Sequence, residues 1–491
     1  MSTAIVSKRH AVCVFWLALA SCVSPAGAQS VETARERITR ADLETEVRFL
    51  ASDELRGRRT GAPEAVLAAR WLAAELEKCG VQPAGDAGTY LQRVPMNLVA
   101  RDAPPRVTAT TRTGETLELV YGVDFDQSDI LTDLRIEHVI VVTRKEDFPP
   151  HAATTVALVL PESREERGAL LTAAGTPSGA GWGLLLTLGP DTAGKPREFS
   201  PSTSGPAVDD GVQRLRLRGD WKKRALAGEL TKLSVVANAT LTPVEAFNVV
   251  GVLAGRGPKA EQAVVVSAHY DHLGVASKPP KEPPKEPPKE PPNAPTGGAA
   301  PDVIFNGADD DASGCAVVLE LADALAHAPP PDRTTIFFFA TGEELGLLGT
   351  NWYVDHPFVP LAKTVLNLNF EMLGRPDALA GGPGKLWLTG DERSNLGETF
   401  RARGVPVVAD PRPEQNFFMR SDNMAFVRRG IVGQSLSTYD LHQDYHHVTD
   451  EADTLDYPHL ETCARIAFDA LSIVVDDAFD PEWSPGQKFE R

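Results

Sequence analysis

Imidazole and carboxylate side chains stand at five places in this sequence where strand-like runs or loops end, and their types are those that bind a divalent metal. They are His269 in SAHYDHLG, Asp310 in NGADDDASG, Glu344 in TGEELGLLG, Glu371 in NLNFEMLGR and His446 in DYHHVTD. Two imidazoles and three carboxylates suit Zn²⁺, and suit Mn²⁺ or Co²⁺ less well. One shared carboxylate and two further ligands for each ion would let these five residues hold two metals about 3.5–4 Å apart.

The adjacent pair Glu343–Glu344 follows a run of β-branched and aromatic residues, Thr334 to Phe339, that predicts a buried strand ending before Gly342. Ligands of open α/β sheets bind beyond the carboxyl ends of strands. Two neighbouring carboxylates there repel each other and lose hydration unless a positive charge compensates them. Because adjacent side chains point apart, one can hold a metal while the other faces a substrate. Alternatively, both are solvated acids at the start of the next helix.

Other acidic and imidazole residues of these segments have alternative interpretations. Asp271 lies two residues after His269 and can accept a hydrogen bond from its imidazole, which would orient the ring toward a metal. We leave His272, His442 and His447 out of the ligand set, because a single histidine is usually structural or solvated. The GADDDASG loop could cap a helix or bind Ca²⁺, but it lacks the spacing and closing Glu of an EF-hand.

Strands that alternate with helices are predicted for residues 30–97 and 243–475, and this alternation indicates an α/β fold. We expect a mixed, mostly parallel sheet between helices. Helices are predicted to begin at Thr39, near Pro63 and at Ser313, and a closing helix is predicted over His459 to Val475. The expected strands include Asn248–Gly251, Ala263–Ala268, Val365–Glu371, Leu386–Leu388 and Val405–Val408.

Residues 98–242 have a different pattern, in which short β-rich runs alternate with turn-rich spacers. The runs are Val107–Thr111, Leu117–Tyr121, His138–Thr143, Val156–Leu160, Leu184–Leu188 and Leu233–Leu241. Few His, Asp or Glu residues converge here, so we interpret the segment as an inserted, mostly β domain. The strands before and after Glu165–Ala174 predict one β-α-β unit within it.

Composition excludes several classes of protein. The 491 residues are 42% apolar and 24% charged, which is ordinary for a globular protein, and their length allows about three domains. The net charge of −18, without a long basic run, disfavours nucleic acids and anionic membranes as partners. Cys79, Cys315 and Cys463 lie outside the N-terminal segment, and this odd, sparse set predicts no disulfide framework.

Residues 1–28 have the features of a signal peptide. A basic pair precedes an apolar segment from Ala11 to Ala20, which is too short to span a bilayer, and small residues precede a cleavage site after Ala28. We therefore expect export to the periplasm or the outside. An alternative signal is present, because the sequence that ends at Cys22 resembles a lipobox and would leave that cysteine lipidated and attached to a membrane.

Two further segments are expected to lie outside the packed structure. Residues 278–302 repeat the unit PPKE, which favours a polyproline II conformation of about 3.1 Å per residue. We interpret them as a disordered, solvated insertion, with a docking ligand as the alternative. The Pro-containing tail, residues 476–491, is expected to be loose.

The five metal-binding segments, in this order, resemble the co-catalytic dizinc aminopeptidase and glutamate carboxypeptidase family of exopeptidases. The resemblance covers residues 243–475, and FLASDELRGRRTG with GVQPAGDAGTYLQRV matches the usual N-terminal lead-in of the family. It implies the dizinc exopeptidase fold. Residues 98–242 stand where many members carry a protease-associated domain, although the match there is loose.

The resemblance also implies roles for individual residues and two Zn²⁺ per chain. Asp310 would bridge the ions, and the peptide bond after it is commonly cis in the family. Glu343 matches the general base that activates the bridging water. Glu371 departs from the pattern, because the best-known members have Asp at this position. The implied ligands are His269, Asp310 and Glu371 for one zinc, and Asp310, Glu344 and His446 for the other.

These expectations describe a secreted aminopeptidase that acts on peptides. A carboxypeptidase or dipeptidase with the same metal site is the alternative, and it would need a basic residue such as Arg375 or Arg420 to bind a substrate carboxylate. A single-zinc enzyme similar to glutaminyl cyclase is disfavoured by the complete five-ligand set. A non-catalytic binding module is also disfavoured, because such scaffolds typically lose ligands or the base, and Glu343 is retained.

Overall fold

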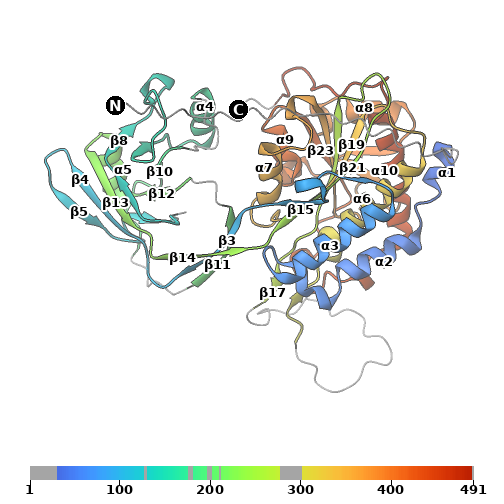
Figure 1. Cartoon of the computed structure of the whole chain (residues 1–491), viewed down its shortest axis with the longest axis horizontal. Helices are drawn as coiled ribbons and strands as arrows, with labels where there is room; N and C mark the ends of the chain where they lie inside the picture. Colours follow the sequence, from blue (N-terminus) through green and yellow to red (C-terminus); the bar gives the residue numbers. More distant parts are fainter. Residues whose placement is uncertain are drawn as a thin grey trace, which may run out of the picture.

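The computed structural model describes residues 30–126, 130–174, 181–195, 202–208, 212–276 and 301–488. The expected signal peptide lies outside these residues, as does the Pro-rich segment up to residue 300. Two bodies are visible in Figure 1: an α/β part that carries both ends of the described chain, and a β-rich part built from the green and light-blue middle of the sequence.

A nine-stranded mixed sheet runs through the α/β part. Its four central strands, β19, β16, β20 and β23, are parallel, so their carboxyl ends meet at one edge of the sheet. The strands β15 and β21 pair antiparallel with β19 and β23 on either side. The strand order is β1 (Gln82–Pro83), β15 (Phe247–Leu253), β19 (Thr334–Ala340), β16 (Ala263–His269), β20 (Thr364–Glu371), β23 (Val432–Ser437), β21 (Leu386–Leu388) and β22 (Val407–Ala409), with β2 (Leu91–Arg93) paired to β15.

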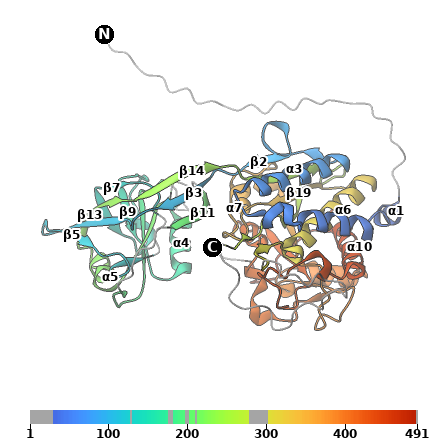
Figure 2. The ribbon, with the colours of Figure 1, turned by 90° about the horizontal axis from the view of Figure 1, so that it is seen from below.

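Helices cover both faces of this sheet, which confirms the predicted fold class (Figures 1 and 2). Alternate residues of one strand enter different cores: Val264 and Val266 pack in the first core and Val265 packs in the second. Burial on both faces explains why the central strands are continuous apolar runs. The first core contains α1 (Val31–Arg35), α2 (Arg40–Leu50), α3 (Pro63–Lys78), α6 (Gly314–His327), α8 (Leu396–Ala402) and α10 (Tyr457–Val474); the second contains α7 (Leu348–Asp355) and α9 (Asn423–Val427).

The β-rich part has three small sheets and its own apolar cores. The predicted β-α-β unit is confirmed, because β9 and β10 are parallel on either side of α4. The run Leu233–Leu241 was expected to be one strand but forms parts of two, since Asn238 has a φ of 50° and the chain changes sheets there. The sheets are β5-β4-β13-β7, β6-β12-β10-β9-β8 and β11-β3-β14, built from β3 (Met96–Arg101), β4 (Arg106–Thr111), β5 (Thr116–Leu119), β6 (Phe125–Asp126), β7 (Leu134–Ile136), β8 (His138–Val141), β9 (Val156–Val159), α4 (Arg164–Ala173), β10 (Leu184–Leu188), β11 (Ser202–Val208), β12 (Arg214–Leu217), α5 (Gly219–Leu226), β13 (Leu230–Val236) and β14 (Ala239–Val244).

A buried arginine joins three segments beneath the carboxyl edge of the sheet. Arg58 is fully buried, and its guanidinium donates hydrogen bonds to the main-chain carbonyls of Leu50, Tyr270, Asn306 and Gly307. Tyr270 follows the last residue of β16, and Gly307 begins the loop that leads to α6. Arg58 therefore fixes the end of a helix and two loops at the sheet edge relative to one another.

The expectation of a loose C-terminal tail is wrong for the described residues up to 488. The fully buried side chain of Arg333 donates to the carbonyls of Val474, Asp476 and Phe479 and pairs with the carboxylate of Asp480 at 2.8 Å. Phe479 itself is buried in the first core. The tail is ordered because these carbonyls accept hydrogen bonds from Arg333, which lies just before β19. Local sequence patterns do not reveal this contact.

We expect Arg58→Met to lower the free energy of unfolding by about 2–4 kcal/mol, because four buried carbonyls lose their shared donor. The matched control is Arg56→Met: the side chain of Arg56 is 58% exposed and lies 3.6 Å from Glu64, so its loss should cost less than about 0.5 kcal/mol. Urea unfolding followed by circular dichroism measures both. Equal stability of the two variants would contradict the structural role of Arg58.

Candidate metal centre

The carboxyl edge of the parallel strands brings together all the residues predicted to form the site. His269 is the last residue of β16 and Glu371 is the last residue of β20. Glu343 and Glu344 follow β19 in a turn, and α7 begins only at Leu348, so the pair is not at a helix start. The two remaining ligands come from loops: Asp310 lies in the segment Ala308–Ser313 before α6, and His446 lies in the loop after β23.

Asp310 lies between the two predicted groups of ligands. Its Oδ1 is 3.1 Å from Nε2 of His269, and its Oδ2 is 3.2 Å from Nε2 of His446. Nε2 of His446 is also 3.2 Å from Oε2 of Glu344. Each carboxylate oxygen of Asp310 therefore faces a different histidine, which is the geometry that a bridging ligand requires. The peptide bond between Asp310 and Asp311 is cis, as the resemblance implies.

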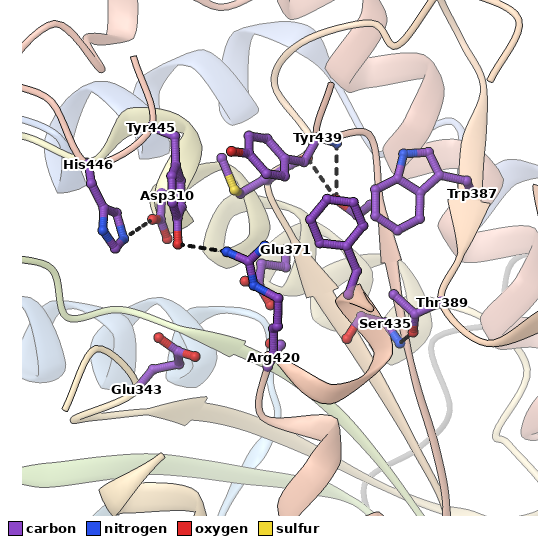
Figure 3. A pocket seen from close by; sticks show the side chains of 14 residues that line it. Asp310, Glu343, Glu371, Trp387, Thr389, Arg420, Ser435, Tyr439, Tyr445 and His446 are labelled. Carbon is purple, nitrogen blue, oxygen red and sulfur yellow. Dashed lines mark hydrogen bonds and ion pairs between the residues drawn. The ribbon is translucent and has the colours of Figure 1, made fainter. Parts of the chain in front are cut away.

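Glu371 lies beside this cluster and lines a cavity together with Asp310 and Glu343 (Figure 3). Its Oε2 accepts a hydrogen bond of 3.4 Å from Nδ2 of Asn369. Burial raises the pKa of Glu371 to about 7, since the attraction of His269 does not outweigh burial and the repulsion of Asp310. Glu371 thus lies where the cluster borders the cavity.

Glu343 lies close to the cluster without touching the second histidine. Its Oε2 is 4.0 Å from Nε2 of His269. Burial raises the pKa of Glu343 well above its ordinary value; the attraction of His269 opposes this change, and repulsion by Glu371 and other carboxylates adds to it. Glu343 is thus a buried carboxylate next to the cluster, the kind of group that can act as a general base.

Asp271 is buried in the site, but it does not contact His269 as we expected. Nδ1 of His269 lies 3.1 Å from the main-chain oxygen of Asp271, while the carboxylate is 4.0 Å away. The carboxylate accepts hydrogen bonds from the main-chain N–H of Glu343, at 3.1 Å, and from the hydroxyl of Thr60, at 2.7 Å. These donors occupy the carboxylate, so the imidazole is oriented by the main chain and Asp271 holds the Glu343 turn.

Two acidic residues that the sequence analysis did not single out hold the loops in place. The carboxylate of Asp450 accepts hydrogen bonds from the main-chain N–H groups of Asp309, at 3.0 Å, and Asp310, at 3.1 Å. Asp311 accepts from the N–H groups of Met372, at 3.0 Å, and Gly314. Asp450 is the last residue of DYHHVTD, and Asp311 lies in GADDDASG. The sequence analysis named both segments, and the presence in each of an Asp that was not assigned as a ligand was the signal that could have identified these residues.

The residues present fit a divalent metal. Nε2 of His269 and Oε1 of Glu344 are buried, yet neither makes a hydrogen bond within the described part of the chain. Zinc–ligand bonds of about 2.0–2.2 Å allow two ligands of one ion to lie 3.1–3.2 Å apart, as the atoms of this cluster do. A cation would also compensate the buried carboxylates, whose pKa values burial raises at Glu343, Glu371 and Asp311.

The cavity beside the cluster has an aromatic wall and one cation. Trp387, Phe417, Tyr439 and Tyr445 line it, and Figure 3 shows Trp387 on the side opposite Glu343. The guanidinium of Arg420 lies over the Phe417 ring, 5.2 Å from its centroid, and its Nη2 is 3.5 Å from the hydroxyl of Tyr445. Among the described residues, Arg420 forms no ion pair with a carboxylate.

Arg375, the other candidate for binding a substrate carboxylate, is already occupied. It pairs with Asp444 at 2.8 Å and with Asp450 at 3.4 Å, and it donates a hydrogen bond to the hydroxyl of Thr454. These partners lie in and after the loop that carries His446. Arg375 therefore stabilises the loop that carries His446 and leaves Arg420 as the cation that faces the cavity.

Residues 248–471 match the sequence profile described as Peptidase family M28. The chain is 32% identical over 140 residues to the probable lipoprotein aminopeptidase LpqL of Mycobacterium tuberculosis, covering 28% of this chain and 25% of that protein. It is 31% identical over 178 residues to aminopeptidase YwaD of Bacillus subtilis, covering 36% and 31%. The chain thus spans about a quarter to a third of the length of these two relatives.

Among solved structures, the aminopeptidase from Aneurinibacillus sp. strain AM-1 is similar at 18% identity, with a TM-score of 0.48 over 91% of this chain and 96% of that one. The profile match begins in β15 and ends in α10, and it includes all five candidate metal ligands together with Glu343. Through this segment, the chain is similar to members of Peptidase family M28.

Proposed function

We propose that this protein is an exported, zinc-dependent exopeptidase that removes N-terminal residues from peptides with two zinc ions. The observation that carries the proposal is the position of Asp310, whose two carboxylate oxygens face His269 and His446 separately. The ligands would be His269, Asp310 and Glu371 for one ion, and Asp310, Glu344 and His446 for the other. Bound zinc supplies a Lewis acid for the scissile carbonyl and a water of lowered pKa.

The chain's own residues would complete the reaction. Glu343 is placed to take a proton from the attacking water and to pass it to the leaving amine. Asp271 would keep Glu343 in position, because its carboxylate accepts the hydrogen bond from the Glu343 N–H group. The aromatic wall of the cavity would exclude water from the residue being removed and would favour an apolar or aromatic side chain.

An amino-terminal substrate end is supported by the relatives, since LpqL and YwaD are both described as aminopeptidases. LpqL is also described as a probable lipoprotein, which agrees with the lipobox-like sequence at Cys22. We favour cleavage after Ala28 slightly over lipidation. In the described residues, no helix is long and apolar enough to cross a membrane. The β-rich part would be a domain of the protease-associated type.

The alternative is a carboxypeptidase or dipeptidase, and Arg420 is the observation that favours it. Its guanidinium lines the same cavity as Glu371 and has no carboxylate partner within the described chain. A free guanidinium next to a peptidase centre can bind a substrate carboxylate with a charge-assisted hydrogen bond. The choice between the two functions therefore depends on which end of the peptide enters the cavity.

We expect Glu343→Gln to lower kcat by about 10²–10⁴-fold with little change in KM, because Gln cannot accept the proton of the water. Both zinc ions should remain bound, since Glu343 is not a proposed ligand. Glu344→Gln is the matched control, and it should reduce the zinc content of the purified protein. For both variants, kinetic assays measure kcat and KM, and elemental analysis measures the zinc content. Loss of zinc in Glu343→Gln, or nearly normal kcat, would show that these roles are wrong.

We expect C-terminally amidated peptides to be hydrolysed and N-acetylated peptides to be resistant, because the free amine is the end that the proposed function recognises. Zinc chelation should abolish the activity, and added zinc should restore it. The opposite preference would identify a carboxypeptidase. In that case Arg420→Leu should raise KM for free-acid peptides by about 10-fold or more, the effect of losing a hydrogen bond to a charged group.

A further inference from the structure

We propose that His272 binds the same metal ion as Glu344 and His446, through its Nδ1, as a ligand additional to the five already described. This inference rests on the proposed function, which supplies the metal. His272 is 1% exposed and lies in the loop after β16, three residues beyond His269. Sequence patterns do not distinguish it from an ordinary structural histidine, whereas its contacts in the fold do.

The contact between His272 and Glu344 is short but is not a hydrogen bond. Nδ1 of His272 lies 2.7 Å from Oε1 of Glu344, and neither atom makes a hydrogen bond within the described residues. Two polar atoms this close repel each other through their lone pairs unless a proton or a cation lies between them. Nε2 of His269, a proposed zinc ligand, is buried and unsatisfied in the same way. His272 thus has the same unsatisfied geometry as a ligand of the centre.

The separations between His272 and the two carboxylates fit one ion, since one ligand atom each of His272, Asp310 and Glu344 lie within 4.8 Å of one another. Ligand bonds of about 2.0–2.2 Å require that two ligands of a single zinc lie no more than about 4.4 Å apart. Nδ1 of His272 is 2.7 Å from Glu344 and 3.9 Å from Oδ2 of Asp310, and His446 is 3.2 Å from each of those carboxylates. The rings of His272 and His446 lie at 69° to each other with their centroids 5.7 Å apart, and they contact different oxygens of Glu344.

The imidazole is fixed in this position by its surroundings. The main-chain N–H of His272 donates to the carbonyl of Arg58, and its ring lies against Gly307. A Cβ at Gly307 would come within 2.6 Å of two ring carbons of His272, so only glycine leaves room for the ring there. Nε2 of His272 also lacks a hydrogen bond in the described part of the chain, which leaves Nδ1 as the nitrogen directed at the carboxylates.

A ligand role for His272 makes the two metal positions unequal. One ion would have four protein side chains, Asp310, Glu344, His446 and His272, and the other would have three. The cavity is lined by Glu371, Asp310, Glu343 and His446, but not by Glu344 or His272. Each ion thus has two of its proposed ligands in the cavity lining, Asp310 with Glu371 for one and Asp310 with His446 for the other.

The test measures zinc binding rather than activity. Apo forms of the full-length wild type, His272→Asn and His272→Phe are dialysed against graded free zinc, and bound zinc is counted per chain. Asn can still donate a hydrogen bond to Glu344 but binds zinc poorly, whereas Phe keeps only the shape. We expect both variants to bind one of the two zinc equivalents at least about 10–100-fold more weakly, because even residues that only support ligands have effects of this size.

His442→Asn is the matched control. His442 is a buried histidine 3.1 Å from Asp309 and lies outside the His272 cluster, so its replacement should leave both zinc equivalents in place. Circular dichroism and the thermal midpoint of each apo protein verify the fold. If His272→Asn bound both zinc ions as tightly as the wild type, His272 would be a hydrogen-bond partner of Glu344 and the inference would be overturned.

A second measurement needs no variant. X-ray absorption at the zinc edge of the loaded wild-type protein counts the coordinated imidazoles, which are those of His269, His446 and His272 if the inference holds. A count that accounts for only the first two would overturn it. A wild-type protein that binds no zinc would instead contradict the proposed function, so the two failures are distinguishable.

Discussion

Buried negative charge at the carboxyl edge of the central sheet is the constraint on which the rest of the structure depends. Asp309, Asp310 and Asp311 are at most 2% exposed, and they lie beside Glu343 and Glu344. Burial alone makes such groups costly to ionise, and repulsion between them adds to the cost. Hydrogen bonds offset part of this cost, and bound cations would have to offset the rest.

The carboxylates that do not face the metal positions bind main-chain N–H groups. Asp271 holds the Glu343 turn, Asp450 holds the Asp310 loop, and Asp311 joins that loop to the residue after β20. Each bond connects segments that are far apart in the sequence. The positively charged counterpart of these carboxylates is Arg58, whose guanidinium donates hydrogen bonds to main-chain carbonyls of the same loops. These charged groups therefore connect the loops of the site both through their N–H groups and through their carbonyls.

Sequence patterns singled out the residues proposed as ligands because the signal for them is local. His269 and Glu371 each end an apolar strand, and the parallel order of these strands brings their ends together. The same reasoning could not assign His272, whose significance depends on Glu344, a residue that precedes α7 and lies far away in the sequence. The same reasoning could not predict that the C-terminal tail is ordered, because Arg333 binds carbonyls more than a hundred residues away. What local patterns miss is the pairing of polar groups by the tertiary fold.

The change of sheet at Asn238 was missed for a different reason. The run from Leu233 to Leu241 is continuous in β propensity, and a strand was the natural expectation. Asn is one of the few residues that adopt a positive φ at small cost, and it allows the chain to leave one sheet and join another. β propensity thus predicted the extended conformation on either side of Asn238 correctly, and it missed only the residue at which the chain turns.

The residues proposed to bind metal and the aromatic residues that line the cavity come mostly from different parts of the chain, and Glu371 belongs to both the proposed ligand set and the cavity lining. The proposed ligands up to Glu344 come from β16, from the loop before α6 and from the turn after β19, whereas the aromatic wall of the cavity comes from segments after β20. Asn369 donates hydrogen bonds both to Glu371 and to the hydroxyl of Ser421, which lines the cavity. Asn369 therefore links Glu371 to the lining of the cavity. A ligand role for Glu371 would tie the geometry of its metal position to the shape of the cavity.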